Sequence, residues 1–445
     1  MKTILVLGAG LSSSSMIRYL LENAPVEDWQ VRIVDRDLEL VNRKINGSPY
    51  GTALAFNALD ADERRPEIEK ADLVISMLPA RFHIGVAEDC IALKKNLITP
   101  SYISPEMRAL DEKAKEAGIV IMNEIGVDPG IDHMSAMKII HSIQDKGGTV
   151  TSFKSFTGGL IAPESDNNPW HYKFTWNPRN VVLAGQGGAA SFLRNGMYKY
   201  IPYNRLFGRL DYLSIEGYGD FVGYPNRDSL SYCKTYGLEN IPTIFRGTLR
   251  RPGYCEAWDV FIELGMTDDT YKMVNTEELT PRTFLNSFLP YHADRSVENK
   301  FKDFLRAERM DSYGHFEWLG LFKNEPLVGL ENATPAQVLQ KILVDKLSLE
   351  DGDKDMIVMV HEFEYELNGE TSKITSHMVN IGEDLTYTSM SNTVGLPVAI
   401  CAKMVLNGTL ASKGVTLPIQ KEVYTPILNE LEEYGISFVE KELVV

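Results

Sequence analysis

The first 35 residues alternate short apolar runs with a segment of helical periodicity. Ile4–Leu7 is an apolar run, Ser13–Asn23 places apolar side chains at helical spacing, and a second run from Val31 ends at Asp35. Apolar runs bounded by turn residues predict buried strands, and the helical spacing predicts an amphipathic helix. The chain therefore opens with a strand, a glycine turn, a helix and a strand.

The same alternation continues to about residue 125. Ser104 is expected to cap one of the helices, with Pro105 at its first position. Alternating strands and helices with short connections predict a parallel, doubly wound sheet. The expected elements are strands at 71–79, 96–102 and 119–125, and helices at 83–95 and 104–118.

A strand, a turn and a helix follow one another in "NEIGVDPGIDHMSAMKII", residues 123–140. The apolar run stops at Asp128-Pro129-Gly130, and Ile131 begins a helical repeat. We interpret this turn as the connection at which the cofactor bound to the sheet meets the substrate domain. The alternative is an ordinary turn at the start of a helix, capped by Asp128.

The pattern changes after residue 130. Segments 149–166 and 355–381 are rich in strand-forming residues, and the second predicts a hairpin around Asn368-Gly369. Helices are expected between them, one with Thr280 as N-cap and one with a capping box of Thr334 and Gln337. Helices return at 392–410 and at the end of the chain.

These elements predict a Rossmann-type α/β fold with a second, mixed α+β sheet domain and a helical insert. The chain is expected to leave the nucleotide-binding domain near residue 130 and to return near 391. The expected domains are 1–129 with 391–445 (dinucleotide-binding), 130–250 with 350–390 (substrate binding and dimerisation) and 251–349 (helical insert).

Composition narrows the function classes. Hydrophobic residues make up 44% and charged residues 24%, as in soluble globular proteins, and no apolar run approaching a membrane span is expected. The net charge of −16 argues against nucleic-acid and anionic-membrane partners. A cytoplasmic location is expected, and an anionic substrate would need a local cluster of arginine and lysine.

Cysteine and histidine give no metal or disulfide pattern. The cysteines contain no C-x-x-C pair, and His361-Glu362 lacks a second histidine four residues later. His361 is therefore interpreted as a strand-surface residue, and no metal site is expected. The four cysteines are Cys90, Cys233, Cys255 and Cys401.

The glycine turn after the first strand predicts a dinucleotide site. Gly8 makes the tight turn, and Gly10 lets the backbone approach a pyrophosphate at the helix N-terminus. Ser13 replaces the usual third glycine, and Asp35 follows Gly10 by 25 positions. Asp35 favours NAD because a carboxylate binds a ribose 2′-OH and repels a 2′-phosphate. Arg36 points the other way, since an arginine here can bind NADP.

Ligands of open parallel sheets bind at the carboxyl ends of the strands. This rule predicts that the residues after three successive strands face the cofactor or its reaction partner. They are Ser76, Leu78 and Pro79, then Ser101 and Tyr102, then Gly126, Val127 and Asp128.

Four ordered blocks resemble the saccharopine reductase family, the glutamate-forming saccharopine dehydrogenases. The resemblance runs from the first strand to about residue 265 and resumes in the C-terminal helices. It implies a nucleotide domain built from both chain ends, a middle sheet domain and a helical third domain. It also implies an NAD(P)-dependent oxidoreductase of lysine metabolism. The blocks are "MNEIGVDPGIDHMSAMKII", "GGLIAPESDNNPWHYKFTWNPRNV", "GYPNRDSLSY" and "RGTLRRPGY".

The family reaction is the oxidation of saccharopine by NAD(P)+ to glutamate and aminoadipate semialdehyde, in either direction. The amine must first lose its proton, because an ammonium has no lone pair to assist hydride departure. The resemblance makes Asp128 and Tyr102 the groups to test for proton transfer. It also implies that cationic or amide groups hold the three substrate carboxylates.

The resemblance carries site residues over by position. Arg227 is expected to clamp a carboxylate, with a surface ion pair to Asp228 or Asp220 as the alternative, and Lys173 is expected near both ligands. His133 is interpreted as a helix-face residue. The substrate set is Ser101, Tyr102, Asp128, Arg227, Gly247, Thr248 and Leu249. The cofactor set is Gly8, Gly10, Leu11, Ser12, Ser13, Asp35, Arg36, Ser76, Leu78, Val127, Asp128, Pro129, Thr175 and Trp176.

Some points stay open. The aromatic set Trp170, Tyr172, Phe174 and Trp176 is either core or pocket wall. Thr157 stands where fungal relatives carry a cysteine, so a catalytic thiol there is excluded. The alternatives to saccharopine oxidation are a carboxynorspermidine-type dehydrogenase acting on a polyamine imine and a non-catalytic nucleotide sensor. A homodimer is expected.

Overall fold

The computed structural model of the chain describes residues 1–184, 186 and 188–444. It contains two compact units, Met1–Val150 with Tyr365–Val445, and Thr151–Glu364. The first unit takes in both ends of the chain, as the resemblance implied. The predicted three-part division, with its separate helical insert, stays a prediction.

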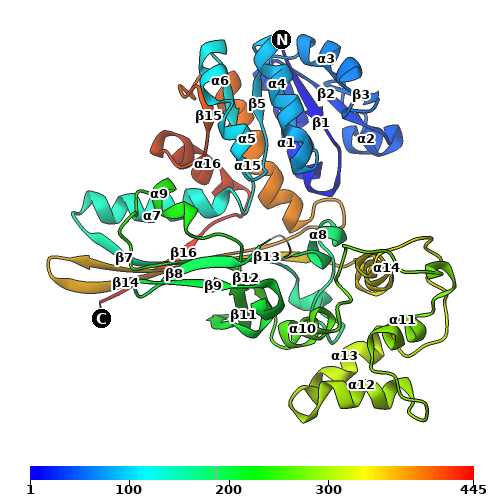
Figure 1. The fold of residues 1–445 in the computed structure, drawn as a ribbon. Coiled ribbons are helices and arrows are strands. Elements are labelled where there is room, and N and C mark those ends of the chain that lie inside the picture. The colour runs from blue at the N-terminus through cyan, green and yellow to red at the C-terminus, as the bar shows by residue number, and fades with distance from the viewer. Residues whose placement is uncertain (185, 187, 445) are drawn as a thin grey trace. The chain divides into compact units, whose positions relative to one another are not determined.

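The first unit is built on a parallel sheet with the strand order β15-β6-β5-β4-β1-β2-β3 (Figure 1). Every neighbouring pair in it is parallel. The order reverses between β4 and β1, which makes this edge of the sheet a ligand-binding crevice in doubly wound folds. The strands are β1 Lys2–Leu7, β2 Trp29–Asp35, β3 Gly51–Ala55, β4 Leu73–Ser76, β5 Asn96–Ile98, β6 Val120–Met122 and β15 Gly414–Thr416.

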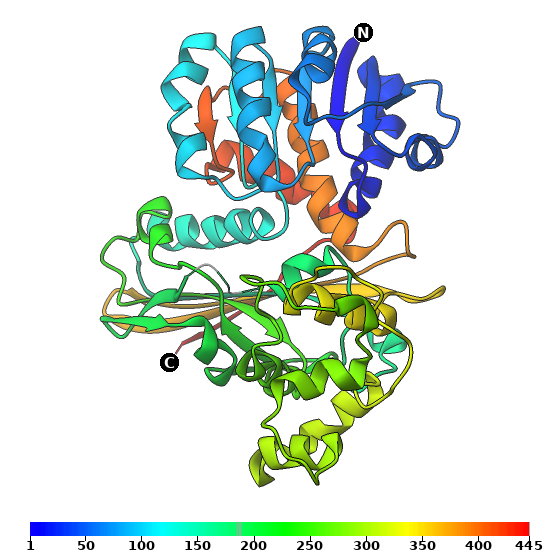
Figure 2. The same cartoon turned by 45° about the vertical axis from the view of Figure 1, so that its right-hand side comes forward.

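Helices cover both faces of this sheet (Figure 2). Helices α3, α4 and α6 pack on one face, where their buried side chains join those of the strands in one apolar cluster. Helices α1 and α15 pack against each other, and a Cβ at Gly395 would lie 2.9 Å from the Met16 nitrogen. The helices of this unit are α1 Ser14–Glu27, α2 Leu38–Ile45, α3 Ala61–Lys70, α4 His83–Leu93, α5 Pro105–Arg108, α6 Asp111–Ala117, α7 Ile131–Asp145, α15 Ser389–Leu406 and α16 Lys421–Glu433.

Helix α15 corrects one expectation from the sequence. Its 18 residues, with a mean hydropathy of 1.3, are long and apolar enough to cross a membrane, by length and composition alone. However, 78% of the helix is buried in the structure, and it packs against α1, β4 and β5. Because a buried core helix passes the same test of length and composition, α15 is explained by its place in the core.

The second sheet is mixed and follows the order β10-β11-β12-β7-β13-β14-β16, with β8 and β9 attached at β12. The boundary between the two units falls inside β7 and β13. The predicted hairpin is confirmed, since β13 and β14 are joined by Asn368 and Gly369, both with positive φ. The strands are β7 Thr149–Ile161, β8 Ala190–Arg194, β9 Met197–Ile201, β10 Asp211–Ile215, β11 Gly219–Pro225, β12 Thr243–Arg250, β13 Asp355–Leu367, β14 Glu370–Ile381 and β16 Val439–Val444.

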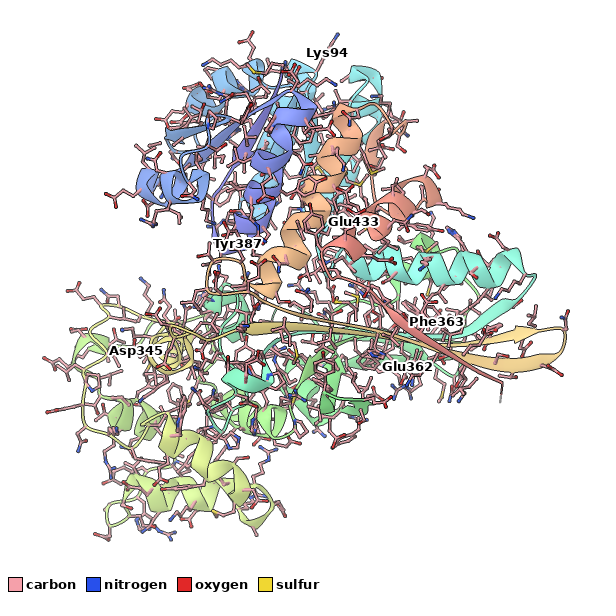
Figure 3. The ribbon with its side chains drawn as sticks, turned by 180° about the vertical axis from the view of Figure 1, so that it is seen from behind. Lys94, Asp345, Glu362, Phe363, Tyr387 and Glu433 are labelled. Carbon is pink, nitrogen blue, oxygen red and sulfur yellow. The ribbon has the colours of Figure 1, made fainter. Side chains whose placement is uncertain are left out.

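Strand β13 is buried over most of its length. His361 is fully buried there, so its interpretation as a surface residue was wrong. Its ring lies 5.9 Å from that of Phe153, which stacks on Phe363 at 4.8 Å. Glu362 and Phe363 are labelled in Figure 3. His361 lies in phase with Phe363 and Tyr365, on the buried side of an alternation whose other side carries Glu362 and Glu364.

The second unit carries the predicted helices between its strands. Thr280 caps α11 and Thr334 caps α14, and both caps are capping boxes, completed by Thr283 and Gln337. The side-chain oxygen of each cap accepts a backbone N–H that the first helical turn leaves unpaired. The helices are α8 Pro178–Val182, α9 Ser231–Thr235, α10 Tyr254–Leu264, α11 Pro281–Phe288, α12 Val297–Leu305, α13 Tyr313–Trp318 and α14 Pro335–Leu347.

Candidate active site

The turn between β1 and α1 has the geometry of a dinucleotide-binding turn. Gly8 has φ +100°, and a Cβ there would lie 3.3 Å from the Met77 backbone. Gly10 has open space where a side chain would be, so a ligand can approach its backbone. The Ser13 hydroxyl donates to the Gly10 carbonyl at 2.8 Å. Leu11 and Ser12 lie between them at the start of the helix, where free N–H groups favour a phosphate.

Asp35 lies at the end of β2, as predicted, but its carboxylate is held by the backbone. One oxygen accepts the Ala9 N–H at 2.8 Å, and the other accepts the Asp37 N–H at 3.2 Å. These bonds tie the carboxylate to the glycine turn. The carboxylate keeps its charge and further lone pairs, so this geometry alone does not decide between a ribose hydroxyl and a 2′-phosphate.

Lys44 is a cation of this site that the sequence analysis missed. It extends from the last turn of α2, and its Nζ donates to the Gly10 carbonyl at 2.5 Å and to the Ser13 hydroxyl at 3.1 Å. Burial lowers its pKa to about 8, while the nearby Asp35 acts in the opposite direction. Lys44 lies 34 residues beyond Gly10 in the sequence, and no motif marks it as a ligand-site residue, because only tertiary folding brings Lys44 to Gly10.

A cavity of about 200 Å³ opens beside the end of β2. Arg36 lies on its wall and donates to the Asn57 side-chain oxygen at 3.0 Å. The cavity is large enough for a heterocyclic base and lies next to the glycine turn. The lining residues are Gly8, Val34, Asp35, Arg36, Phe56, Asn57, Ala58, Leu59, Leu78, Pro79 and Phe82.

The strand ends of the first unit bring predicted residues together. Ser76 is fully buried at the end of β4, and Ser101 follows β5. His83 lies between them, with Nδ1 2.9 Å from the Ser76 hydroxyl and Nε2 2.8 Å from the Ser101 hydroxyl. His83 was missed because nothing in its sequence context distinguishes it from any residue that opens a helix.

Tyr102 and Asp128, the two predicted proton-transfer groups, are in direct contact. The Tyr102 hydroxyl donates to Asp128 Oδ1 at 2.7 Å, although 26 residues separate them. Both side chains are half-buried, so a ligand can reach them. Asp128 does not cap α7, whose N-cap is Gly130, so the interpretation of this turn as a simple helix entry was wrong.

The turn from 126 to 130 is fixed by its glycines and by a buried polar contact between Glu124 and His133. A Cβ at Gly130 would lie 2.0 Å from the Gly126 carbonyl oxygen, so no other residue fits. Glu124, at φ +56°, accepts the Ile103 N–H at 2.9 Å, and its other oxygen lies 2.7 Å from His133 Nε2. His133 is therefore a buried partner of Glu124. Val127 and Pro129, predicted cofactor contacts, are buried within the same turn.

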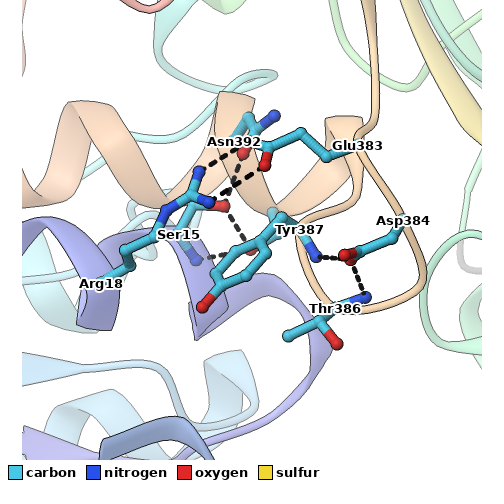
Figure 4. A network of polar contacts seen from close by, with 8 residues as sticks. Ser15, Arg18, Glu383, Asp384, Thr386, Tyr387 and Asn392 are labelled. Carbon is cyan, nitrogen blue, oxygen red and sulfur yellow. Dashed lines mark hydrogen bonds and ion pairs between the residues drawn. The ribbon is translucent and has the colours of Figure 1, made fainter. Parts of the chain in front are cut away.

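The C-terminal segment secures the start of α1 (Figure 4). The Ser15 N–H donates to the Ser391 hydroxyl at 2.9 Å, and the Ser15 hydroxyl donates to the Asn392 side-chain oxygen at 2.5 Å and lies 3.0 Å from the Ser391 hydroxyl. Arg18 binds both carboxylate oxygens of Glu383, at 3.0 and 2.6 Å. A bidentate pair of this kind is directional as well as strong, so the segment that leads into α15 helps to orient the helix whose N-terminus would receive the pyrophosphate.

The second unit carries the other predicted substrate residues. Arg227 is exposed in the turn after β11 and has φ +48°; its carbonyl accepts the Ser191 N–H. On β12, Gly247 and Leu249 are buried and Thr248 is half-buried. A Cβ at Gly247 would lie 2.8 Å from the Phe156 ring, so packing alone explains this glycine. The clamp role of Arg227 stays a prediction.

Three of the four aromatic residues in 170–176 belong to the core. Trp170 and Tyr172 are fully buried, and Phe174 is buried, whereas Trp176 is half-buried. Lys173 is also buried, and its ammonium forms an ion pair with Asp353 at 2.6 Å. Thr175 is buried between these residues, and Thr157 is buried on β7.

Arg250 is a buried arginine to which the sequence analysis gave no role. Its guanidinium lies 5.0 Å from the ring of Tyr172, 5.9 Å from Tyr224 and 5.2 Å from Tyr254. It also donates to the Leu249 carbonyl at 2.7 Å. Aromatic faces stabilise a buried guanidinium through cation–π attraction. The run "RGTLRR" shows that a cation is present. The three tyrosines around Arg250 come from separate segments of the chain, so the sequence does not predict their contact with it.

These features define a class of protein: a nicotinamide-dinucleotide oxidoreductase with a doubly wound nucleotide unit. Two family models match the chain, the saccharopine dehydrogenase NADP binding domain over residues 4–122 and the saccharopine dehydrogenase C-terminal domain over residues 126–436. The chain belongs to the saccharopine dehydrogenase family.

Two curated relatives are similar over nearly the whole chain. The saccharopine dehydrogenase [NADP(+), L-glutamate-forming] of Pyricularia oryzae is 33% identical over 461 residues, and that of Saccharomyces cerevisiae is 35% identical over 452 residues; each alignment covers 99% of both chains. The solved apo structure of the L-Glu-forming saccharopine dehydrogenase from Saccharomyces cerevisiae matches with a TM-score of 0.90 at 33% identity, over 100% of both chains. These findings support the predicted family and fold, and they do not support the polyamine alternative or the lean towards NAD.

Proposed function

We propose that the protein is an L-glutamate-forming saccharopine dehydrogenase, which interconverts saccharopine with glutamate and aminoadipate semialdehyde. The observation that carries this proposal is the 2.7 Å hydrogen bond between Tyr102 and Asp128 at the strand ends of the nucleotide unit. Its support is the family and the similarity to curated enzymes of that name over nearly the whole chain.

The reaction requires a proton acceptor before hydride transfer. When bound, the oxidised dinucleotide accepts a hydride from the carbon next to the substrate nitrogen. The Tyr102 hydroxyl accepts the proton that the secondary ammonium must lose as it passes its own proton to the Asp128 carboxylate, since only the free amine has a lone pair to assist. The product is an imine, to which water adds; the carbinolamine then loses glutamate and leaves the semialdehyde.

NADP is the proposed cofactor. The family's nucleotide domain is described as NADP binding, and the relatives' names carry NADP(+). In this chain, Arg36 on the wall of the cavity and Lys44 beside the glycine turn are cations within the nucleotide unit, and the Asp35 carboxylate is bound to backbone amides. Guanidinium and ammonium groups are suited to bind the extra phosphate of NADP.

The test of the activity is a spectrophotometric assay with the purified protein. Saccharopine is added with NADP+ or with NAD+, and the absorbance of the reduced nicotinamide is followed; carboxynorspermidine precursors with NADPH serve as the alternative substrate. We expect reduction with saccharopine and higher kcat/KM with NADP+. Activity with the polyamine precursors alone would refute the proposal.

The cofactor proposal is tested by the variant Arg36→Ala. Because a hydrogen bond to a charged group contributes about 1.5–3 kcal/mol, the affinity for NADP+ should fall about 10- to 100-fold, with little change for NAD+. Arg43→Ala is the matched control, since Arg43 is an exposed cation on α2 that pairs with Glu39. Equal losses for the two dinucleotides would show that Arg36 does not contact the 2′-phosphate.

A homodimer through the middle sheet is also proposed, and a cytoplasmic location is proposed from the composition of the chain. Analytical ultracentrifugation of the purified protein measures the first, and fractionation of the source cells measures the second. A monomer at micromolar concentration would refute the dimer.

A further inference from the structure

We propose that His83 is a positioning residue for the reaction: its ring holds the Ser101 hydroxyl in the orientation that the substrate needs and links it to the Ser76 hydroxyl. This inference rests on the proposed function, because Ser101 is a predicted substrate contact and Ser76 a predicted cofactor contact. It adds a residue to which the sequence analysis gave no role.

His83 opens α4 at the carboxyl edge of the parallel sheet. Its side chain is buried, with 3% of the residue exposed, and it contacts three hydroxyl groups. Nδ1 lies 2.9 Å from Ser76 Oγ, and Nε2 lies 2.8 Å from Ser101 Oγ and 3.0 Å from Thr99 Oγ1. The hydroxyls come from the ends of β4 and β5, the edge at which such sheets bind ligands.

The imidazole is neutral at physiological pH. Burial lowers the pKa of His83 to about 4, so the ring offers one donor nitrogen and one acceptor nitrogen. If Nδ1 donates to Ser76, then Nε2 must accept from the hydroxyls on its other side, and the reverse holds for the other tautomer. The direction of the Ser101 hydroxyl is therefore coupled to that of Ser76 through the ring.

Replacement of Thr99 distinguishes the proposed role of His83 from a purely structural one. Its hydroxyl touches the same Nε2, and it also accepts the Ser101 N–H at 3.3 Å. It is fully buried, and no predicted ligand contact is assigned to it. If His83 acts through Ser101, loss of the Thr99 hydroxyl should matter much less than loss of the imidazole nitrogen that faces Ser101.

Two conservative variants separate the contact at Nδ1 from the contact at Nε2. In His83→Asn the side-chain amide reaches roughly the position of Nδ1, which keeps a partner for Ser76 and removes the partner of Ser101. In His83→Gln the amide reaches roughly the position of Nε2, which keeps a partner for Ser101. Thr99→Val is the matched control, and thermal unfolding of each variant reports whether it folds.

The measurements are kcat and KM for saccharopine and the dissociation constant for NADP+. We expect His83→Asn to lower kcat/KM for saccharopine about tenfold, the cost of one misplaced hydrogen bond, while His83→Gln and Thr99→Val stay within about threefold of the wild type. The dissociation constant for NADP+ should change by less than about twofold in His83→Asn, because the Ser76 side is retained.

A double-mutant cycle decides whether His83 acts through Ser101. In a Ser101→Ala background, His83→Asn should cause no further loss of kcat/KM, because the group that it positions is already absent. Additive losses, or equal losses in His83→Asn and His83→Gln that follow thermal stability, would overturn the inference. A wild-type protein that binds NADP+ but does not oxidise saccharopine would instead refute the proposed function, and the inference with it.

Discussion

Replacement of Arg64 by alanine should destabilise the nucleotide unit and loosen its cavity. The Arg64 side chain is 8% exposed and the Asp89 side chain 2%, and Nε lies 2.7 Å from Oδ2. Arg64 Nη1 also donates to the carbonyls of Ala58 and Leu59, which line the cavity. The variant leaves Asp89 buried with a single partner and removes a donor from the 58–59 loop.

The magnitude follows from the burial of the pair. Breaking a buried ion pair by removing one partner costs about 3–5 kcal/mol. Because Arg65 stays bound to the Asp89 carboxylate, the cost should lie near the lower end of this range. In a domain of 150–250 residues, each kcal/mol lowers the melting temperature by about 2–4 °C, so the midpoint should fall by about 10 °C. The affinity for NADP+ should also fall, since two carbonyls of the cavity wall lose their donor.

Arg65→Ala is the matched control, because Arg65 binds the other oxygen of the same carboxylate, at 2.6 Å, but is 59% exposed. Because the Arg65 side chain stays largely in water, its attraction to Asp89 is screened and should contribute about 0–1 kcal/mol, so this variant should melt within about 3 °C of the wild type. Thermal unfolding measured by differential scanning calorimetry, together with NADP+ titration, gives both quantities. Equal shifts for Arg64→Ala and Arg65→Ala would refute the reasoning from burial.

Three further predictions follow from the first unit. Gly130→Ala should cost more than about 4 kcal/mol in thermal unfolding, because its Cβ would overlap the Gly126 carbonyl, whereas Gly147→Ala, at φ +81° with no atom within 4 Å, should cost about 1 kcal/mol. Tyr102→Phe should lower kcat about 100-fold with an unchanged NADP+ dissociation constant; an unaltered kcat across the pH range would exclude the hydroxyl from proton transfer. The contribution of His83 to the free energy of unfolding should fall by about 3 kcal/mol between pH 6.5 and pH 4. In that window the unfolded chain protonates His83, whereas most of the folded chain does not. Chemical denaturation of His83→Gln should show a shallower fall over the same window.

Much of the fold could be predicted from local signals. The predicted strands and helices of residues 4–35 and 71–125, the caps at Thr280 and Thr334 and the hairpin at Asn368-Gly369 depend on periodicity, capping and turn chemistry within a few residues. The elements between them, α2, β3 and α3, were not predicted. The prediction also differed from the structure at two further places. His361 was read as a surface residue although it lies in phase with the buried Phe363 and Tyr365, and the helix predicted at 392–410 begins earlier, at Ser389, which makes its apolar run longer than expected.

The sequence by itself determined the class of fold and the placing of most candidate residues at turns and strand ends, because those positions follow from short-range spacing. Only the tertiary structure decided which of them touch. It joined Tyr102 to Asp128, brought Lys44 to the glycine turn, placed His83 between two hydroxyls and turned Asp35 towards the backbone. Such contacts depend on how segments far apart in the sequence pack together, and local periodicity contains no information about that packing.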